Sequence, residues 1–268
     1  MFFALRRLGR RELSEYQHNR VQSRGAHAAP QGQGPVRPVS VSQGRRKPKR
    51  SGGVWRVVFI ISLIVFVCAA GALAFIGYGY WHGQQNNKQL EQIGFNAPDA
   101  AALQRMDLAS FTVDWDALRA INPDVVGWIY VPGTTVNFPI VHGTDDEHYL
   151  KTDFYGQTSW VSFGSIFLSA ANAADFSDAN NIVYGHHMND GSMFSPFADF
   201  GDADTFNGHR TVYVFTPTAN YQLTTFSIVH CAADDPLAQT AFASEQERQA
   251  YVQDKVDRSV VTVAGLPS

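Results

Sequence analysis

The sequence predicts a mainly β domain with a few helices, held to a membrane by one spanning helix. Three observations indicate this. The 24-residue run from Val57 to Tyr80 contains no charged residue and no proline. The chain after it is a series of short β-branched and aromatic runs separated by turn residues. Residues 1–56 hold 13 of the 21 Lys and Arg residues but only two of the 24 Asp and Glu residues, so the two sides of the run differ strongly in charge.

Residues 1–55 are interpreted as a disordered, basic cytoplasmic tail. They are rich in Gln, Gly, Pro, Ser and Arg and show no sustained apolar period. The basic cluster GRRKPKR at 44–50 could bind nucleic acid, but it stands directly before the apolar run. Beside a membrane span such a cluster more commonly fixes topology and contacts anionic lipid. We therefore expect no nucleic-acid partner.

Residues 56–81 form the predicted transmembrane helix. About 20 apolar residues suffice to cross a bilayer, and Trp55 and Tyr78 stand where interfacial aromatic residues are expected. Buried core helices are shorter and usually amphipathic, and a cleaved signal peptide would not follow about fifty polar residues. The positive-inside rule predicts a single pass through the cell membrane with a cytoplasmic N-terminus and an extracellular C-terminal domain. Residues 82–110 are expected to form a juxtamembrane helical linker, which Asn96-Ala-Pro98 interrupts.

Residues 111–268 are expected to form one domain in which short strands close into a barrel with helices over its ends. Asp114 caps a short helix that ends before Pro123, and Ser244 opens a late helix with acidic residues in its first turn. On that helix Arg248, Lys255 and Arg258 are expected to form a solvated face. Strands are predicted at 125–131, 137–141, 165–168, 181–186, 211–215 and 221–230.

The candidate catalytic group is His186. Strand alternation over NIVYGH places Ile182, Tyr184 and His186 on one face, with His186 where the strand opens into a loop rich in Gly, Asn and Asp. Histidine is the usual acid–base residue at neutral pH, although an ordinary hydrogen-bonded surface histidine would fit the same position. His187 points to the opposite face. No CxxC or HExxH spacing occurs, so the sequence predicts no metal and no cofactor.

Several blocks together resemble the class B sortases, which are membrane-anchored cysteine transpeptidases of Gram-positive bacteria. The blocks are INPDVVGWIYVPGTTVNFPIV (121–141), YL (149–150), FGSIFL (163–168), NNIVYGHHMNDGSMF (180–194) and YQLTTFSIV (221–229), and the similarity runs from about residue 111 to the C-terminus. The resemblance implies a sortase-like β-barrel with a helix before the penultimate strand, a position that the predicted helix after Ser244 fits.

The resemblance also implies a reaction. A cysteine attacks the threonine carbonyl of a C-terminal sorting signal, LPxTG-like or NPxTx-like, and an amine of a peptidoglycan precursor or a pilin resolves the acyl-enzyme. The partners would be surface proteins that carry such signals. The residue matching the family's histidine is His186, which protonates the leaving amine and deprotonates the incoming one. Leu150, Tyr251 and Val252 match positions that hold the sorting peptide, although packing roles in the core would explain them as well.

The sequence departs from the family pattern at the nucleophile. It stops at VVTVAGLPS, after the late helix, and contains neither the TLxTC-type strand nor the following arginine strand. We therefore expect a barrel that is incomplete at the C-terminus and lacks its last strands. Cys68 lies in the span, and Cys231 follows a different strand, so a packing role for Cys231 is expected. Two functions remain open: the transpeptidase, and an inactive membrane-tethered barrel that binds sorting peptides or wall proteins.

Overall fold

The structure is a computed structural model that describes residues 2–6, 52–95, 111–158, 163–232, 235 and 239–261. Predictions that concern residues 7–51, 96–110 and 262–268 lie outside the described residues. The chain divides into two compact units, one made of Met1–Leu8 with Ala72–Ser268 and the other of Gly9–Gly71. The first unit contains the sheet and the candidate site.

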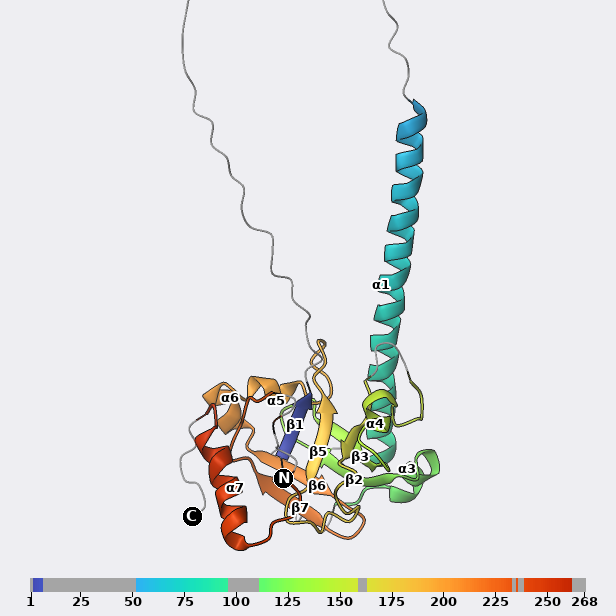
Figure 1. The fold of residues 1–268 in the computed structure, drawn as a ribbon. Coiled ribbons are helices and arrows are strands. Elements are labelled where there is room, and N and C mark those ends of the chain that lie inside the picture. Colours follow the sequence, from blue (N-terminus) through green and yellow to red (C-terminus); the bar gives the residue numbers. More distant parts are fainter. Residues whose placement is uncertain are drawn as a thin grey trace, which may run out of the picture. The chain divides into compact units, whose positions relative to one another are not determined.

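A curled half-barrel sheet of seven described strands forms the centre of the first unit (Figure 1). Along the sheet the strands follow the order β1-β5-β4-β3-β2-β6-β7. Two pairs, β1 with β5 and β3 with β4, are parallel, and the other neighbours are antiparallel. The strands are β1 (Phe2–Arg6), β2 (Val125–Tyr130), β3 (Asn137–His142), β4 (Ile166–Leu168), β5 (Ile182–His186), β6 (Thr211–Phe215) and β7 (Asn220–Thr224).

Six described helices accompany the sheet: α1 (Gly52–Gly94), α3 (Trp115–Ile121), α4 (His148–Lys151), α5 (Pro196–Asp199), α6 (Ala203–Gly208) and α7 (Glu245–Asp257). Caps predicted from the sequence are present. The Asp114 carboxylate accepts a hydrogen bond from the Ala117 N–H at the start of α3, and the Ser244 hydroxyl accepts one from the Glu247 N–H at the start of α7. These bonds satisfy backbone donors that a helix leaves unpaired in its first turn.

Alternating side chains place one hydrophobic cluster on each face of the sheet. The inner cluster contains Ile129, Ile166 and Val214 together with the phenylalanines of α5 and α6. The outer cluster contains Trp128, Tyr213 and Phe215, over which the C-terminal end of α1 and the helix α3 pack. On β5, Val183 belongs to the inner cluster, whereas Tyr184 packs against the outer one. The alternation predicted for this strand is therefore confirmed, and His186 lies on the same face as Tyr184.

Helix α1 is one continuous helix from Gly52 to Gly94, so the predicted span and the first part of the predicted linker are a single element. It ends directly before Asn96-Ala-Pro98, as expected. The described part of the chain has one helix long and apolar enough to cross a membrane, and none of its most apolar window is buried in the protein. From Gly79 onward the burial follows a helical period that includes the buried Leu90 and Gly94. The second half of α1 thus packs on the domain.

Two segments differ from expectation. Residues 2–6, expected in a disordered tail, are paired with β5 as the strand β1. The strand predicted to reach residue 230 ends at Thr224. Beyond that point the chain leaves the sheet for the end of α7: the Val260 N–H donates to the Ile228 carbonyl, and the Ile228 N–H donates to the Ser259 hydroxyl.

Candidate active site

The imidazole of His186 is held by the backbone of α4. The His186 Nε2 atom lies 2.6 Å from the carbonyl oxygen of Leu150. A carbonyl oxygen can only accept, so Nε2 carries the proton and Nδ1 is the nitrogen left for proton exchange. Leu150 stands in the last turn of α4, where carbonyl groups have no partner within the helix. The ring therefore satisfies a backbone acceptor and is oriented by it.

Polar contacts at the start of α4 and within it fix the position of this helix. At its start, the Asp145 carboxylate accepts hydrogen bonds from the N–H groups of His148 and Glu147, which lower the pKa of Asp145. Within the helix, the buried Tyr149 donates its hydroxyl proton to Asp124 at 2.7 Å. The Asn122 amide donates to the same hydroxyl at 3.2 Å. A four-residue helix is too short to be stable alone, so these bonds determine where the Leu150 carbonyl points.

The buried phenol of Tyr149 makes the stability of this region sensitive to alkaline pH. Burial, followed by the hydrogen bond to Asp124, raises the pKa of Tyr149 to about 12. The unfolded chain ionises near pH 10, before the folded one, so the contribution of this group is complete below pH 10 and is lost as the pH rises towards 12. In Tyr149→Phe we expect the fall in unfolding free energy between pH 10 and 12 to shrink by about 2 kcal/mol. Chemical denaturation of the unaltered protein and of Tyr149→Phe at pH 10 and pH 12 measures this fall. An equal fall in the two proteins would contradict the raised pKa of Tyr149.

Gly164 allows the close approach of the ring and α4. Its φ is +53°, and a Cβ atom there would lie 2.6 Å from the Tyr149 carbonyl oxygen, 2.8 Å from that of Leu150 and 3.0 Å from the His186 ring. Gly185 has a similar role on the other face of β5, where a Cβ would lie 2.5 Å from the Phe194 ring. Both glycines are required by close contacts rather than by chain flexibility.

The loop that follows His186 is fixed at several points. The Phe194 N–H donates to the His186 carbonyl, and the Ser195 hydroxyl accepts from the Met188 N–H and donates to the Met188 carbonyl. Met193 is buried with a φ of 57°, a backbone conformation that costs a non-glycine residue about 1 kcal/mol or more. The surrounding contacts compensate for this strain. The loop thus presents a defined surface beside the imidazole.

The second half of α1 contacts both segments that flank His186. On the loop after β5, the Gln84 amide donates to Asp190 at 3.1 Å. On the segment before β4, the Asn86 amide lies 3.4 Å from Asp153, and Tyr80 packs edge-to-face on Phe163 with ring centroids 5.5 Å apart. The helix that leaves the apolar run therefore forms part of the framework of the site. The residues of α1 that make these contacts are mostly polar and form no apolar stripe, so the sequence did not reveal this packing.

Neither described cysteine is placed as a partner of the imidazole. Cys68 lies in the apolar part of α1, and Cys231 is exposed. Partial burial and the neighbouring Asp235 raise the pKa of Cys231, whereas a nucleophilic thiol needs a lowered one. The prediction that Cys231 packs as a small hydrophobe is wrong in one respect, because its side chain is exposed rather than buried.

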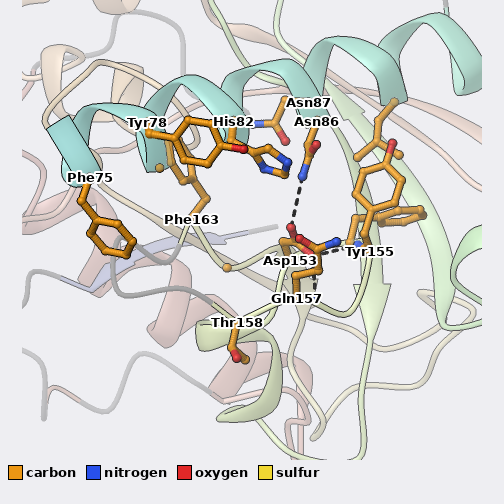
Figure 2. Close-up of a pocket in the computed structure, with 15 residues that line it drawn as sticks. Phe75, Tyr78, His82, Asn86, Asn87, Asp153, Tyr155, Gln157, Thr158 and Phe163 are labelled. Atoms are coloured by element: carbon orange, nitrogen blue, oxygen red, sulfur yellow. Dashed lines mark hydrogen bonds between the residues drawn. The ribbon is translucent and has the colours of Figure 1, made fainter.

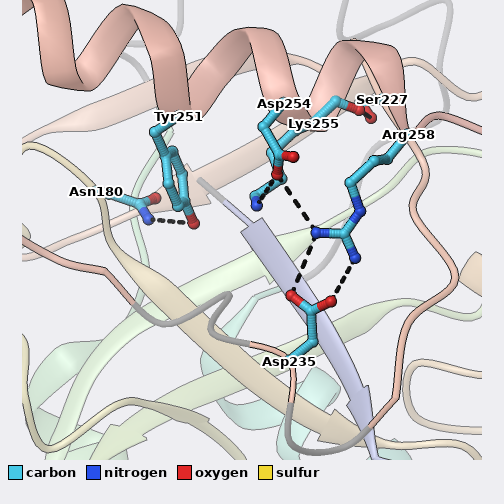
Figure 3. Close-up of polar contacts among 7 residues, drawn as sticks. All are labelled: Asn180, Ser227, Asp235, Tyr251, Asp254, Lys255 and Arg258. Carbon is cyan, nitrogen blue, oxygen red and sulfur yellow. Dashed lines mark hydrogen bonds and ion pairs between the residues drawn. The ribbon is translucent and has the colours of Figure 1, made fainter.

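Tyr251 and Val252 lie on α7, away from the contacts of His186 with Leu150. Tyr251 is buried and receives a hydrogen bond from Asn180 at 3.3 Å (Figure 3). Its ring also packs on Phe242. Val252 is half-buried, as is Leu150. Of the four predicted site residues, the structure brings Leu150 and His186 together directly.

The expected solvated face of α7 was wrong for Lys255. Its ammonium is buried, pairs with Asp254 at 2.5 Å and lies 4.5 Å from the Tyr251 ring centroid. Arg258 forms a further ion pair with Asp235 (Figure 3). A carboxylate and an aromatic face together compensate the lysine for the loss of water, and no pattern in the helix sequence showed that this would happen.

Comparisons with known proteins find similar sequences and similar folds. No model of a known protein family matches the chain. A sortase B of Listeria monocytogenes is 29% identical over 198 residues, which cover 72% of this chain and 78% of that protein. A Staphylococcus aureus sortase B–substrate complex is similar with a TM-score of 0.58 and 27% identity, over 70% of this chain and 83% of that one.

A third relative has a slightly higher sequence identity. Clostridium perfringens sortase B is 30% identical with a TM-score of 0.53, over 56% of this chain and 82% of that one. The chain therefore belongs to the class B sortases, a family of cysteine transpeptidases.

Proposed function

We propose that this protein is a membrane-anchored transpeptidase that cleaves a C-terminal sorting signal, LPxTG-like or NPxTx-like, and joins the new acyl group to an amine of the cell wall or a pilin. The observation that carries the proposal is the imidazole of His186, oriented by the Leu150 carbonyl at the end of β5. The similar Staphylococcus aureus sortase B has been solved as a complex with its substrate.

The proposed reaction proceeds in two balanced steps. The thiolate of the family's catalytic cysteine adds to the threonine carbonyl, and the C–N bond to the next residue breaks. His186 gives its proton to the leaving amine, and the threonine remains bound to the sulfur as a thioester. An acceptor amine then attacks that thioester, His186 removes a proton from the attacking nitrogen, and the thiolate leaves as the new amide forms. The raised pKa of Cys231 makes it unsuited to the thiolate role.

We assign the three predicted residues to the sorting-peptide site, Leu150 and Val252 as contacts and Tyr251 as a positioning residue. Leu150 and Val252 are half-buried and offer apolar side chains to the peptide. Tyr251 is buried and acts by holding Asn180, which precedes β5. Leu150 has two roles in the proposal, because its carbonyl orients the imidazole while its side chain lines the peptide site.

The proposal includes a single membrane pass with the N-terminus in the cytoplasm and the domain outside. The apolar, unburied helix α1 supports it, as do the 13 basic residues up to Arg56. In this arrangement residues 2–6 lie across the bilayer from β5, so strand β1 and membrane insertion exclude each other. A membrane-inserted chain thus has an open β5 edge beside His186.

Deleting the gene from its host tests the proposed function. We expect a surface protein with a sorting signal to move from the cell-wall fraction to the membrane fraction, with its C-terminal signal uncleaved. Restoring the gene returns the protein to the wall. An unchanged distribution and unchanged cleavage would refute the transpeptidase. A binding barrel without turnover predicts a changed location but an unchanged length of the surface protein.

A further inference from the structure

The short segment 163–165 joins the second half of α1 to α4. Its first residue, Phe163, is buried, and the ring lies beside α1 (Figure 2). That ring packs edge-to-face on Tyr80 of α1, with the ring centroids 5.5 Å apart. At the other end of the segment, the Ser165 N–H donates to the Tyr149 carbonyl at 2.9 Å, and the Ser165 hydroxyl donates to the Thr152 carbonyl at 3.0 Å. The segment is therefore bonded to α4 while its first side chain packs on α1.

The contact between α1 and Phe163 leaves no room for a side chain at Gly83. A Cβ atom on Gly83 would lie 2.6, 2.7 and 3.0 Å from three atoms of the Phe163 ring. Carbon atoms that are not bonded to each other attract best at about 3.5–4.0 Å and repel at shorter distances, so the helix or the ring would have to move. The absence of a side chain at Gly83 thus sets the distance between α1 and Phe163.

A movement of Phe163 would reach the imidazole through the next residue. Gly164 lies so close to the Leu150 carbonyl and the His186 ring that a Cβ atom there would meet them at 2.8 and 3.0 Å. Close-packed interiors transmit small displacements instead of absorbing them. A shift of Phe163 away from α1 therefore pushes Gly164 towards the bond between Leu150 and His186.

The same part of α1 also contacts the loop on the other side of His186. The Gln84 amide donates to Asp190 at 3.1 Å, and the Asn87 amide lies 3.9 Å from the Met193 sulfur. Gly83 and Asn87 are four residues apart, so they share one face of the helix. A displaced α1 would thus disturb both segments that flank the imidazole.

We propose that Gly83 and Phe163 are positioning residues of the active site. The glycine brings α1 onto the Phe163 ring, and the segment 163–165 transmits this position to α4, whose Leu150 carbonyl orients His186. Neither positioning residue takes part in the chemistry itself. The inference rests on the proposed function and adds that α1, the proposed membrane anchor, also supports catalysis.

Gly83→Ala in the chromosomal gene of the host tests the inference. We expect the attachment of a sorting-signal protein to the wall to slow about tenfold, because catalytic rates are sensitive to displacements of the acid–base group. Pulse labelling followed by separation of wall and membrane fractions measures the rate.

Gly94→Ala is the matched control on the same helix. A Cβ atom on Gly94 would also lie 2.6 Å from an aromatic ring, but the ring is that of Trp128 in the outer cluster. Both variants gain the same helix propensity and meet a ring at the same distance, so we expect their unfolding temperatures to agree within about 3 °C. Gly94→Ala should keep the attachment rate within about twofold. Equal slowing by the two variants would show a loss of stability alone and would overturn the inference.

A second substitution removes the ring that the new methyl group would meet. In the Phe163→Leu background, Gly83→Ala should slow attachment less than about twofold, compared with about tenfold when Phe163 is present. The same slowing in both backgrounds would show that the effect of Gly83 does not pass through Phe163.

Nitrogen-15 NMR of the purified full chain with labelled histidine tests the positioning without any transpeptidation. We expect Gly83→Ala to shift the Nε2 signal of His186, because the bond to Leu150 changes, and Gly94→Ala to leave that signal in place. Gly83 and Phe163 also line a pocket of about 330 Å³ (Figure 2). A ring that turned into this pocket would leave the His186 signal unchanged, and that result would overturn the inference. Equal attachment with and without the gene would instead refute the proposed function, and the NMR comparison would still decide whether Gly83 positions the ring.

Discussion

In a host strain whose chromosomal gene carries His186→Ala, attachment of a sorting-signal protein to the wall is expected to slow by about 10²–10⁴-fold, the usual contribution of a positioned acid–base group. The imidazole is the described side chain at the end of β5 that the Leu150 carbonyl orients. Pulse labelling of the surface protein, followed by separation of wall and membrane fractions, measures the rate. The altered protein should accumulate in the membrane at its uncleaved length.

Two control strains test whether the slower attachment is specific to the loss of His186. His187→Ala changes the adjacent histidine, which is exposed and follows the end of β5, and it should leave the rate within about twofold, as surface substitutions usually do. Cys231→Ser should also leave it unchanged, because that thiol has a raised pKa. An unaffected rate in His186→Ala, or a loss in Cys231→Ser as large as that expected for His186→Ala, would contradict the assigned roles.

Gly164→Ala is expected to have the second largest effect. The new methyl group would meet two carbonyl oxygens of α4 at 2.6 and 2.8 Å while the backbone keeps a φ of +53°. Strain and overpacking together should cost about 2–4 kcal/mol of unfolding free energy. Displacing the Leu150 carbonyl by about 1 Å should also lower the anchoring rate about 10²-fold, since catalytic geometry is sensitive to such shifts.

Gly156→Ala is the matched control for this substitution. Gly156 has a φ of +76°, but a Cβ there has no atom within 4 Å. It should lose about 1 kcal/mol from backbone strain alone and keep its anchoring rate. Denaturant unfolding of the two variants in detergent, with anchoring rates from the matching strains, gives the comparison. Equal losses in both would show that the packing around Gly164 is not what positions the imidazole.

Six of the seven described strands and the helices α1, α3 and α7 could be predicted from the sequence, because each follows from a local pattern. The apolar run, the turn-bounded strands and the cap residues Asp114 and Ser244 depend on near neighbours only. The alternation in NIVYGH likewise placed His186 on the correct face of β5. The family resemblance added the sortase-like fold and the general class of activity.

The supports of the site could not be predicted, because they depend on contacts between distant segments. The carbonyl that orients His186 lies 36 residues earlier, and nothing in the sequence marks Leu150 as the acceptor. Nothing in the sequence distinguishes Gly164 from an ordinary loop glycine, and only the folded backbone shows why a larger residue does not fit. On the inward side of α1, Gly83, Asn86 and Asn87 stand between the apolar Tyr80 and Leu90, so the sequence shows no unbroken apolar stripe there.

The orientation of one ring decides whether this site can exchange protons as described. Nitrogen-15 NMR of the full chain with labelled histidine reports which ring nitrogen of His186 carries the proton in the neutral form, with His186→Gln identifying the signal. We predict a protonated Nε2 and an unprotonated Nδ1, as the bond to Leu150 demands. A proton on Nδ1 with a bare Nε2 would show that the ring does not donate to Leu150 and would contradict the site described here.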